Sequence, residues 1–222
     1  MHAGSKPGRV RWWTFTRSSQ LLDVKNAHDS IVRSVLTSRT EQGPPPRRLN
    51  WGCGQHPEPG WINSDVKDDP GIDISCDIRN GLPLEDDGLD YVVSIHALPM
   101  IPYPDLVTVL QELRRVLRPG GILRLALPDF DKAVRAYQAG DRSYFLVPDE
   151  DEPTLSGQMI VHLLWYGYSV TLFTEEFARS LLLRAGFRKV EACGFRETAS
   201  AFPEIVELDN REHESFFIEA VK

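Results

Sequence analysis

The feature that most restricts the fold is an alternation of short apolar runs with helical segments from residue 47 onward. Residues 104–117 carry leucines at helical spacing, and Thr174 can cap a second helix that ends at Gly186. Runs typical of strands lie at 48–51, 61–66, 73–77, 89–95, 122–127, 190–195 and 216–221. The fifth run follows Pro119-Gly120-Gly121, which we expect to stop the first helix. This order predicts an α/β fold with a mostly parallel seven-stranded sheet and helices on both faces.

The first 46 residues form a different region. Apolar residues at roughly helical spacing predict one or two helices within 20–39, and the aromatic residues nearer the start are expected to dock on the domain or on a ligand. Residues 43–46 read Gly-Pro-Pro-Pro, which stops any helix because proline fixes φ and lacks a donor. We therefore expect an N-terminal helical attachment with a proline-rich linker at 1–46 and one domain at 47–222.

Composition excludes several classes of protein. The 222 residues suit a single domain, with 41% hydrophobic and 26% charged residues, and the net charge of −7 gives no general attraction to nucleic acid. No stretch reaches the length of about 20 apolar residues that a membrane span needs, and no apolar region of a signal peptide follows the first basic residues. Three cysteines without a CxxC spacing predict reduced thiols in the cytoplasm, with no disulfide framework and no metal site.

A glycine turn, Gly52-Cys53-Gly54, ends the first predicted strand. Such a turn lets a ligand approach the backbone at the carboxyl edge of a sheet, although turn geometry alone also explains the glycines. The dinucleotide pattern is broken, because Pro57 stands where a third glycine is needed. Pro57 and Pro59 also disfavour the helix whose N-terminus would hold a phosphate. A nucleoside ligand without phosphate is favoured over NAD.

Two acids follow the turn in an informative order. Asp65 ends the second predicted strand, only 11 residues after Gly54, and is placed to accept hydrogen bonds from two ribose hydroxyls. Asp77 ends the third strand and is placed to accept from an adenine amino group, with Ile78 packing on the ring. Each acid taken singly can also be explained as a loop cap, but the two in this order behind a glycine turn are much less readily explained by chance.

At this point the sequence resembles class I S-adenosylmethionine-dependent methyltransferases, and within them a small bacterial group with the pattern GCG…GWxNxD. The resemblance covers residues 48–130 firmly and extends more loosely to the C-terminus. The segments that carry it are RLNWGCG at 48–54, GWINSD at 60–65, DI at 77–78, LPL at 82–84, LDYVVSIH at 89–96 and RVLRPGGILR at 115–124. It implies a Rossmann-like sandwich and S-adenosylmethionine as the cofactor.

The resemblance also assigns roles to residues. Gly52 and Gly54, with Cys53 as a small packing residue between them, would contact the methionine part of the cofactor. Asn50 stands where many relatives have Asp or Glu, so it would accept from the cofactor's ammonium group without a charge. Asp65 would bind the ribose, and Asp77 with Ile78 would contact the adenine. Ser94 and His96 would line the methyl end of the cofactor.

One departure from the family pattern lies directly after the fourth predicted strand. Relatives commonly read HxLEH, whereas this chain has His96-Ala-Leu-Pro-Met100. Any base or cofactor contact that relatives draw from the last two positions is absent. This departure motivates a second hypothesis, a non-catalytic partner subunit with the same fold.

Methyl transfer from a sulfonium depends mainly on alignment, which can contribute about 7–11 kcal/mol. A base is needed only if the acceptor loses a proton. His96 and His162 are the two candidate catalytic residues, because histidine titrates near neutral pH. The competing interpretations are a polar rim residue for His96 and an interior or surface helix residue for His162.

The segment 129–173 is longer than a plain crossover requires and is rich in aromatic residues. Aromatic residues over the ligand edge of a sheet suggest a lid for an apolar or planar substrate, but they also fit a small core of the segment's own.

These observations favour a methyltransferase that acts on an oxygen or nitrogen atom of a small molecule, with no nucleic acid or membrane partner. Another reaction on the same cofactor fold and the non-catalytic subunit remain alternatives, and a dehydrogenase ranks third. The sequence leaves the acceptor and the oligomeric state open, a homodimer included.

Overall fold

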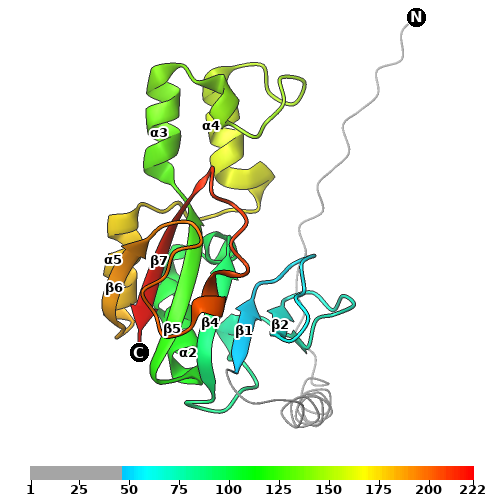
Figure 1. Cartoon of the computed structure of the whole chain (residues 1–222). Coiled ribbons are helices and arrows are strands. Elements are labelled where there is room, and N and C mark those ends of the chain that lie inside the picture. The colour runs from blue at the N-terminus through cyan, green and yellow to red at the C-terminus, as the bar shows by residue number, and fades with distance from the viewer. Residues whose placement is uncertain (1–46) are drawn as a thin grey trace, which may run out of the picture.

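The computed structural model describes residues 47–222 (Figure 1). The N-terminal attachment expected at 1–46 lies outside the described residues.

In the described part of the chain, seven strands form one sheet in the order β3-β2-β1-β4-β5-β7-β6. All neighbouring strands pair in parallel except β7, which runs antiparallel to β5 and β6. The predicted seven-stranded, mostly parallel sheet is therefore confirmed. The strands are β1 (Arg48–Trp51), β2 (Ile62–Asp65), β3 (Ile74–Ser75), β4 (Leu89–Ile95), β5 (Leu117–Pro128), β6 (Arg188–Cys193) and β7 (Ser215–Val221).

Within residues 47–222, four α-helices and six short 3-10 turns connect the strands. Thr174 accepts from the backbone N–H of Phe177 and so caps the last helix, as its sequence predicts. The helices are α2 (Leu106–Val116), α3 (Phe130–Ala139), α4 (Leu155–Leu164) and α5 (Glu175–Arg184), and the 3-10 turns are η1 (Ile78–Asn80), η2 (Leu98–Met100), η3 (Tyr103–Asp105), η4 (Arg142–Tyr144), η5 (Trp165–Gly167) and η6 (Pro203–Val206).

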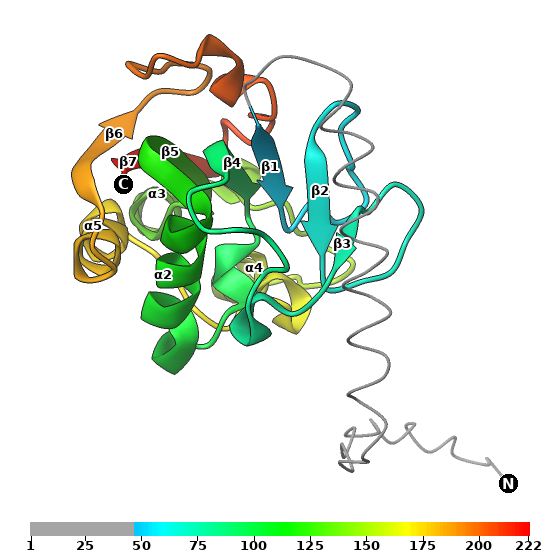
Figure 2. The ribbon, with the colours of Figure 1, turned by 90° about the horizontal axis from the view of Figure 1, so that it is seen from below.

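The two faces of the sheet are covered differently (Figure 2). Helices α2 and α5 pack on one face, where Leu110 and Leu181 meet strand residues such as Val92 in the main core. On the other face η6 places Ile205 against Tyr91. Neighbouring strand residues thus serve opposite layers, as the two-residue period of a strand requires. In residues 47–222, no helix is both long and apolar enough to cross a membrane.

Strand β5 differs from its prediction at its start. It begins at Leu117, not at residue 122, so the helix-stopping sequence lies inside the strand. The pairing with β4 jumps from Leu117 to Ile122, and the four residues between them bulge out of the ladder. Gly120 has a φ of +79°, a left-handed conformation that a bulge tolerates best at glycine.

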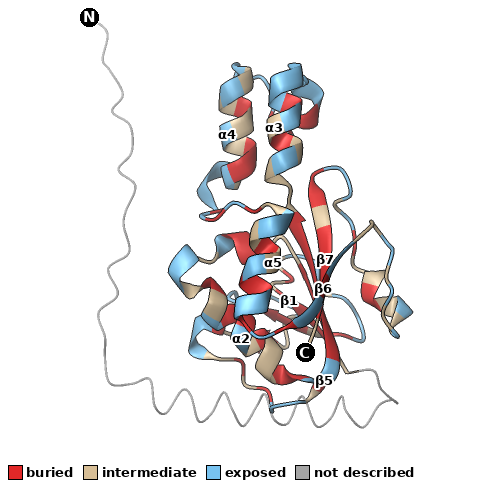
Figure 3. Cartoon of the chain, turned by 90° about the vertical axis from the view of Figure 1, so that its left-hand side faces the viewer, coloured by how far each residue is buried: buried red, intermediate tan, exposed pale blue. Residues whose placement is uncertain are grey.

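A lobe made of α3, η4 and α4 stands beyond the carboxyl ends of the parallel strands (Figure 1). Both of its helices carry buried as well as exposed residues (Figure 3). Its own core includes Ala133, Tyr144, Phe145 and Leu163. The lobe begins and ends at one place, because Asp129 and Phe173 form an isolated parallel bridge.

Arg124 lies fully buried in the middle of β5. Its guanidinium pairs with Asp209 at 2.5 Å and with Glu219 at 2.6 Å. It also donates to the carbonyl oxygens of Gly194 and Glu197. A single side chain therefore ties the long connection between β6 and β7 to the centre of the sheet.

Candidate functional site

The strand order reverses between β1 and β4, and open α/β sheets bind ligands beyond the carboxyl ends of strands at such a point. The loops that follow these two strands touch. A Cβ atom added at Gly52 would lie 2.2 Å from the Cβ of Ala97, so no larger residue fits there. The backbone of the glycine turn therefore passes directly against the side chain of Ala97.

The glycine turn has the conformation that its sequence predicts. Gly52 and Gly54 have φ values of +69° and +55°, and the N–H groups of Gly52 and Cys53 both donate to the carbonyl of Ser64. A Cβ atom at Gly54 would meet nothing within 4 Å, so this side of the turn faces open space. Burial and the nearby carboxylate of Asp65 raise the pKa of the Cys53 thiol to about 11, which fits a packing residue and not a nucleophile.

Two asparagines hold the loop that follows the turn. The Asn50 amide donates to the Asn63 side-chain oxygen at 3.1 Å and to the His56 carbonyl at 3.2 Å. Asn63 also bonds both backbone groups of Glu58, so the loop is fixed to β2 without a helix. The prediction that Pro57 and Pro59 prevent a helix here is confirmed. The side-chain oxygen of Asn50 accepts nothing from the described residues, which leaves it available to an ammonium donor.

Asp65 belongs to the same unit as the glycine turn. Its Oδ2 accepts the Gly54 N–H at 2.9 Å and its Oδ1 accepts the Lys67 N–H at 3.1 Å. Because a carboxylate offers about four lone-pair positions, each oxygen can still accept from a ligand. This arrangement matches a pair of neighbouring hydroxyl groups.

Asp77 and Ile78 are less available for contacts with an adenine ring. Both oxygens of Asp77 bond the guanidinium of Arg79, and its Oδ1 also accepts the Arg79 N–H, so the acid caps η1. The bonds from Arg79 keep the pKa of Asp77 below its ordinary value. Ile78 is buried in the main core. An adenine amino group would have to share the carboxylate with Arg79, and this role stays a prediction.

Ser94 and His96 lie at the carboxyl end of β4. Ser94 is buried, and its hydroxyl has no hydrogen-bond partner among residues 47–222. His96 has a φ of +57°, a strained conformation for a residue with a side chain, and its Nε2 lies 2.7 Å from the Ser215 hydroxyl. Burial, together with the charges of Arg211 and His162, lowers the pKa of His96 to about 3, so its imidazole is neutral.

The loop that departs from the family pattern after His96 contacts the segment that returns from the lobe through its main chain. The carbonyl of Pro99 accepts the N–H groups of Val170 and Thr171, at 2.9 and 3.1 Å. The Thr171 hydroxyl donates to the Ile101 carbonyl. The loop after β4 therefore anchors the segment that returns from the lobe, while the Met100 side chain is half-exposed.

His162 lies in α4 with only 5% of its surface exposed. Its Nδ1 accepts the Leu146 N–H at 3.3 Å, and its Nε2 is 3.8 Å from Oε2 of Glu214. Burial lowers the pKa of His162 more than Glu214 raises it. The two candidate histidines contact adjacent residues, because His162 lies beside Glu214 and His96 bonds the next residue, Ser215. The burial agrees with an interior helix residue, and a catalytic role stays a prediction.

Several residues of this region escape sequence reasoning. The two histidines lie near Tyr144, Arg211, Glu214 and Ser215. Arg211 and Glu214 belong to a polar stretch directly before β7, and Ser215 is the first residue of that strand. The sequence signal that could have indicated these residues is the polar run at 209–215, which leads into the apolar strand β7 at the edge of the sheet where ligands bind.

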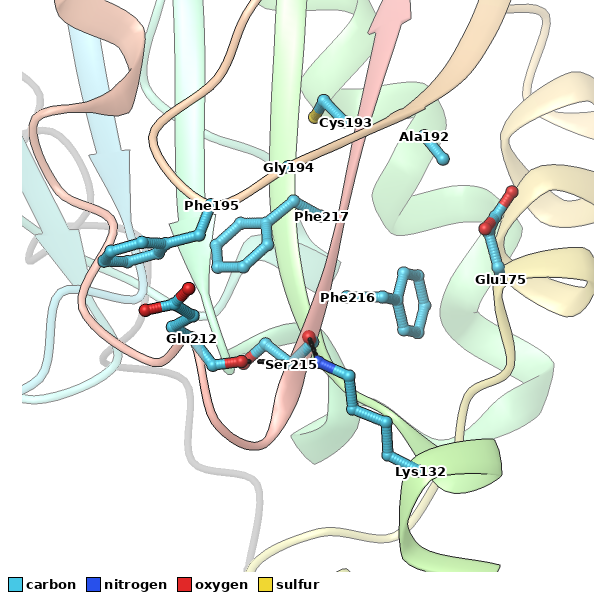
Figure 4. Close-up of a pocket in the computed structure, with 10 residues that line it drawn as sticks. All are labelled: Lys132, Glu175, Ala192, Cys193, Gly194, Phe195, Glu212, Ser215, Phe216 and Phe217. Carbon is cyan, nitrogen blue, oxygen red and sulfur yellow. Dashed lines mark hydrogen bonds between the residues drawn. The ribbon is translucent and has the colours of Figure 1, made fainter. Parts of the chain in front are cut away.

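A pocket of about 290 Å³ opens beside this region, where β6 ends and β7 begins (Figure 4). Phe195 and Phe217 line it on one side of β7 and Phe216 on the other. The Lys132 ammonium group donates to the Ser215 carbonyl at 2.6 Å at its edge. Since Ser215 also bonds His96, the pocket and the end of β4 share a residue. Within the described part of the chain, no group of three or more His, Cys, Asp or Glu side chains is placed to hold a metal.

Comparisons with known proteins agree with this geometry. A family model described as "Methyltransferase domain" matches residues 58–125. The demethylmenaquinone methyltransferase of Bacillus cytotoxicus is 28% identical over 127 residues, which are 57% of this chain and 40% of that protein. The protein of the same name from Bacillus cereus (strain AH187) is 29% identical over 129 residues, which are 58% of this chain and 41% of that protein. The match spans less than half the length of these curated relatives.

Among solved structures, a SAM dependent methyltransferase from Archaeoglobus fulgidus shares the fold with a TM-score of 0.52. It is 14% identical, and the alignment covers 92% of this chain and 100% of that one. At this identity the likeness concerns the fold alone.

Proposed function

We propose that this chain, which has the fold of class I S-adenosylmethionine-dependent methyltransferases, moves a methyl group from S-adenosylmethionine to an oxygen or nitrogen atom of a small-molecule acceptor. The observation that carries the proposal is the joined unit of the glycine turn and Asp65, placed where the strand order reverses.

The residues present fit the cofactor. The open space beside Gly54 admits a ligand against the backbone, and the remaining lone pairs of Asp65 suit the two ribose hydroxyls. The free side-chain oxygen of Asn50 suits the ammonium group, and Gly52 with Cys53 shapes the turn around the methionine part. Asp77 and Ile78 would flank the adenine, and Ser94 and His96 the methyl end. When bound, this cofactor supplies an electrophilic methyl group on a positively charged sulfur.

The chain's own contribution is alignment more than proton transfer. The neutral imidazole of His96, fixed by Ser215 and by the strained backbone at the end of β4, can orient an acceptor without placing a second positive charge near the sulfonium. Holding two reactants in line can contribute about 7–11 kcal/mol. The chain therefore needs no strong base for an acceptor that gives up its proton readily.

A small acceptor is supported by three features. The net charge of −7 disfavours a nucleic-acid partner. The lobe stands over the carboxyl edge of the sheet, where an insertion can act as a lid. The pocket of about 290 Å³ that shares Ser215 with His96 is near the lower limit for small-molecule sites.

Calorimetric titration of the full chain with S-adenosylhomocysteine tests the proposal, with NAD as a parallel control. We expect saturable binding of S-adenosylhomocysteine and none of NAD. Absence of binding would mean that the glycine turn and Asp65 keep the shape of a cofactor site without its function, and would favour the non-catalytic subunit. The ion pair of Asp77 with Arg79 also supports that alternative.

A further inference from the structure

A buried polar cluster lies between the lobe and the start of β7. We define it as Tyr144 from η4, His162 from α4, and Glu214, the residue before β7. All three are more than nine-tenths buried. The rings of Tyr144 and His162 are 5.5 Å apart, and Nε2 of His162 is 3.8 Å from Oε2 of Glu214. The cluster adjoins the proposed methyl end, because Ser215 follows Glu214 in the chain and bonds His96.

The Tyr144 hydroxyl is an unused donor. It has no hydrogen-bond partner among the described residues, although it is buried. More than about 90% of buried polar groups in proteins have a partner, and an unsatisfied one costs about 1–3 kcal/mol. Burial, Asp129 and Glu214 raise the pKa of Tyr144, so the hydroxyl keeps its proton and can donate it.

His162 offers a second unused donor. Because its Nδ1 accepts the Leu146 N–H, the proton of the neutral ring must be on Nε2. That N–H faces Glu214 across 3.8 Å, which is too long for a hydrogen bond. In this tautomer His162 can donate to a ligand but cannot take up a proton from it without losing the Leu146 contact.

Glu214 supplies an unused acceptor. Its Oε1 is taken by the Arg211 guanidinium at 2.9 Å, whereas its Oε2 receives no hydrogen bond from the described residues. The backbone carbonyl of Glu214 accepts the Asp129 N–H at 2.8 Å, which fixes the residue to the base of the lobe. The carboxylate is thus held in place with one oxygen uncommitted.

Two donors and one acceptor match one functional group in particular. A hydroxyl oxygen can accept from Tyr144 and from His162 while its own proton is donated to Glu214. An ammonium group cannot accept at all, and a neutral amine accepts only one hydrogen bond. We propose that the Tyr144–His162–Glu214 cluster binds a hydroxyl group of the acceptor molecule. This inference rests on the proposed function and narrows its acceptor to hydroxyl-bearing small molecules.

The test uses three probes that share one ring, namely p-cresol, p-toluidine and toluene, which carry a hydroxyl group, an amine and neither. Their binding to the full chain is measured by ligand-observed NMR, with and without saturating S-adenosylhomocysteine. We expect p-cresol to bind about tenfold more tightly than toluene and more tightly than p-toluidine. Equal binding of p-cresol and toluene would overturn the proposal.

Variants separate recognition from structure. Tyr144→Phe removes the unsatisfied hydroxyl with little change in volume, so we expect an equal or higher melting temperature together with p-cresol affinity lowered about tenfold. Glu214→Gln should weaken p-cresol binding similarly, whereas Glu150→Gln, an exposed glutamate of the lobe that belongs to neither the cluster nor the pocket, should not. A lower melting temperature of Tyr144→Phe with unchanged p-cresol affinity would mean that the hydroxyl is structural, contrary to the proposal.

Failure of the proposed function has a different signature. If S-adenosylhomocysteine does not bind, the cofactor assignment fails, yet the probe series on the free protein still decides the hydroxyl site. If S-adenosylhomocysteine binds and p-cresol shows no preference, the cofactor assignment stands and only the cluster assignment fails.

Discussion

The backbone N–H of Gly54 donates to Oδ2 of Asp65 at 2.9 Å, so the turn after β1 and the acid that ends β2 form one rigid unit. The pairing of Asn50 with Asn63 fixes the same two strands one step earlier. In this chain, bonds between neighbouring strands take the place of a helix after the glycine turn. The ligand edge is therefore built by side chains that accept or donate hydrogen bonds and not by a helix dipole.

Asp65→Ala should weaken S-adenosylhomocysteine binding by about 1–3 kcal/mol, because charge-assisted hydrogen bonds to the ribose are lost. Titration calorimetry measures the change. Asp68→Ala, an exposed acid in the following loop, is the matched control and should bind as the parent does. An unchanged affinity of Asp65→Ala would remove Asp65 from the site.

The two glycines of the turn should respond differently to alanine. Gly52→Ala forces its Cβ to within 2.2 Å of Ala97, so we expect a marked loss of stability in urea unfolding. Gly54→Ala meets no atom within 4 Å and should cost only about 1–2 kcal/mol for its positive φ. Its larger effect should be on cofactor binding, because the methyl group enters the open space beside the turn. Similar stability losses for both variants would contradict this division.

Arg124→Met should destabilise the fold by about 3–5 kcal/mol, because it leaves the carboxylates of Asp209 and Glu219 buried without their partner. The free energy of unfolding in urea is the measurement. Arg118→Met removes a half-exposed arginine that pairs with Asp90 and should cost no more than about 1 kcal/mol. A small effect of Arg124→Met would show that the loop between β6 and β7 is held by other contacts.

His96 should make the fold sensitive to acid. Its pKa is about 3 in the folded chain, against about 6.5 when unfolded, so the unfolded state takes up the proton first. Stability is then complete above pH 6.5 and falls toward pH 3, by up to about 1.4 kcal/mol per pH unit. The charges of Arg211 and His162 contribute to this lowering of the His96 pKa, after burial.

His96→Asn removes the contribution of His96 protonation to the pH dependence of stability, and asparagine tolerates the positive φ at this position. Between pH 7 and pH 5 the variant should lose less stability in urea unfolding than the parent does. Equal losses would mean that His96 is protonated in the folded protein.

The strands were predictable because each is a short apolar run bounded by polar or glycine-rich turns, as at residues 89–95, where the bounds agree with β4. The start of β5 was not predictable from the sequence. Pro119-Gly120-Gly121 is typical of a turn, and these residues belong to the strand because of pairing with β4 and with the end of the chain after β7. Tertiary pairing overrides a local signal of this kind.

The placement of the candidate site residues was predictable where they follow a strand end. Asp65 and the two glycines lie where their order in the chain places them, because parallel strands align their carboxyl ends. The capture of Asp77 by Arg79 and the burial of Ile78 could not be foreseen, since they depend on rotamers and packing. Glu214 and Tyr144 are 70 residues apart, and no local pattern indicates that they meet His162.

The bridge between Asp129 and Phe173 brings the entry and exit of the lobe side by side. A loop whose ends already meet gains residues at little entropic cost, about 0.6 kcal/mol for each doubling of length. The lobe can accordingly be exchanged for another between residues 129 and 173 without breaking a single strand pairing of the seven-stranded sheet. In such an exchange the sheet and its carboxyl edge stay constant while the segment above them changes.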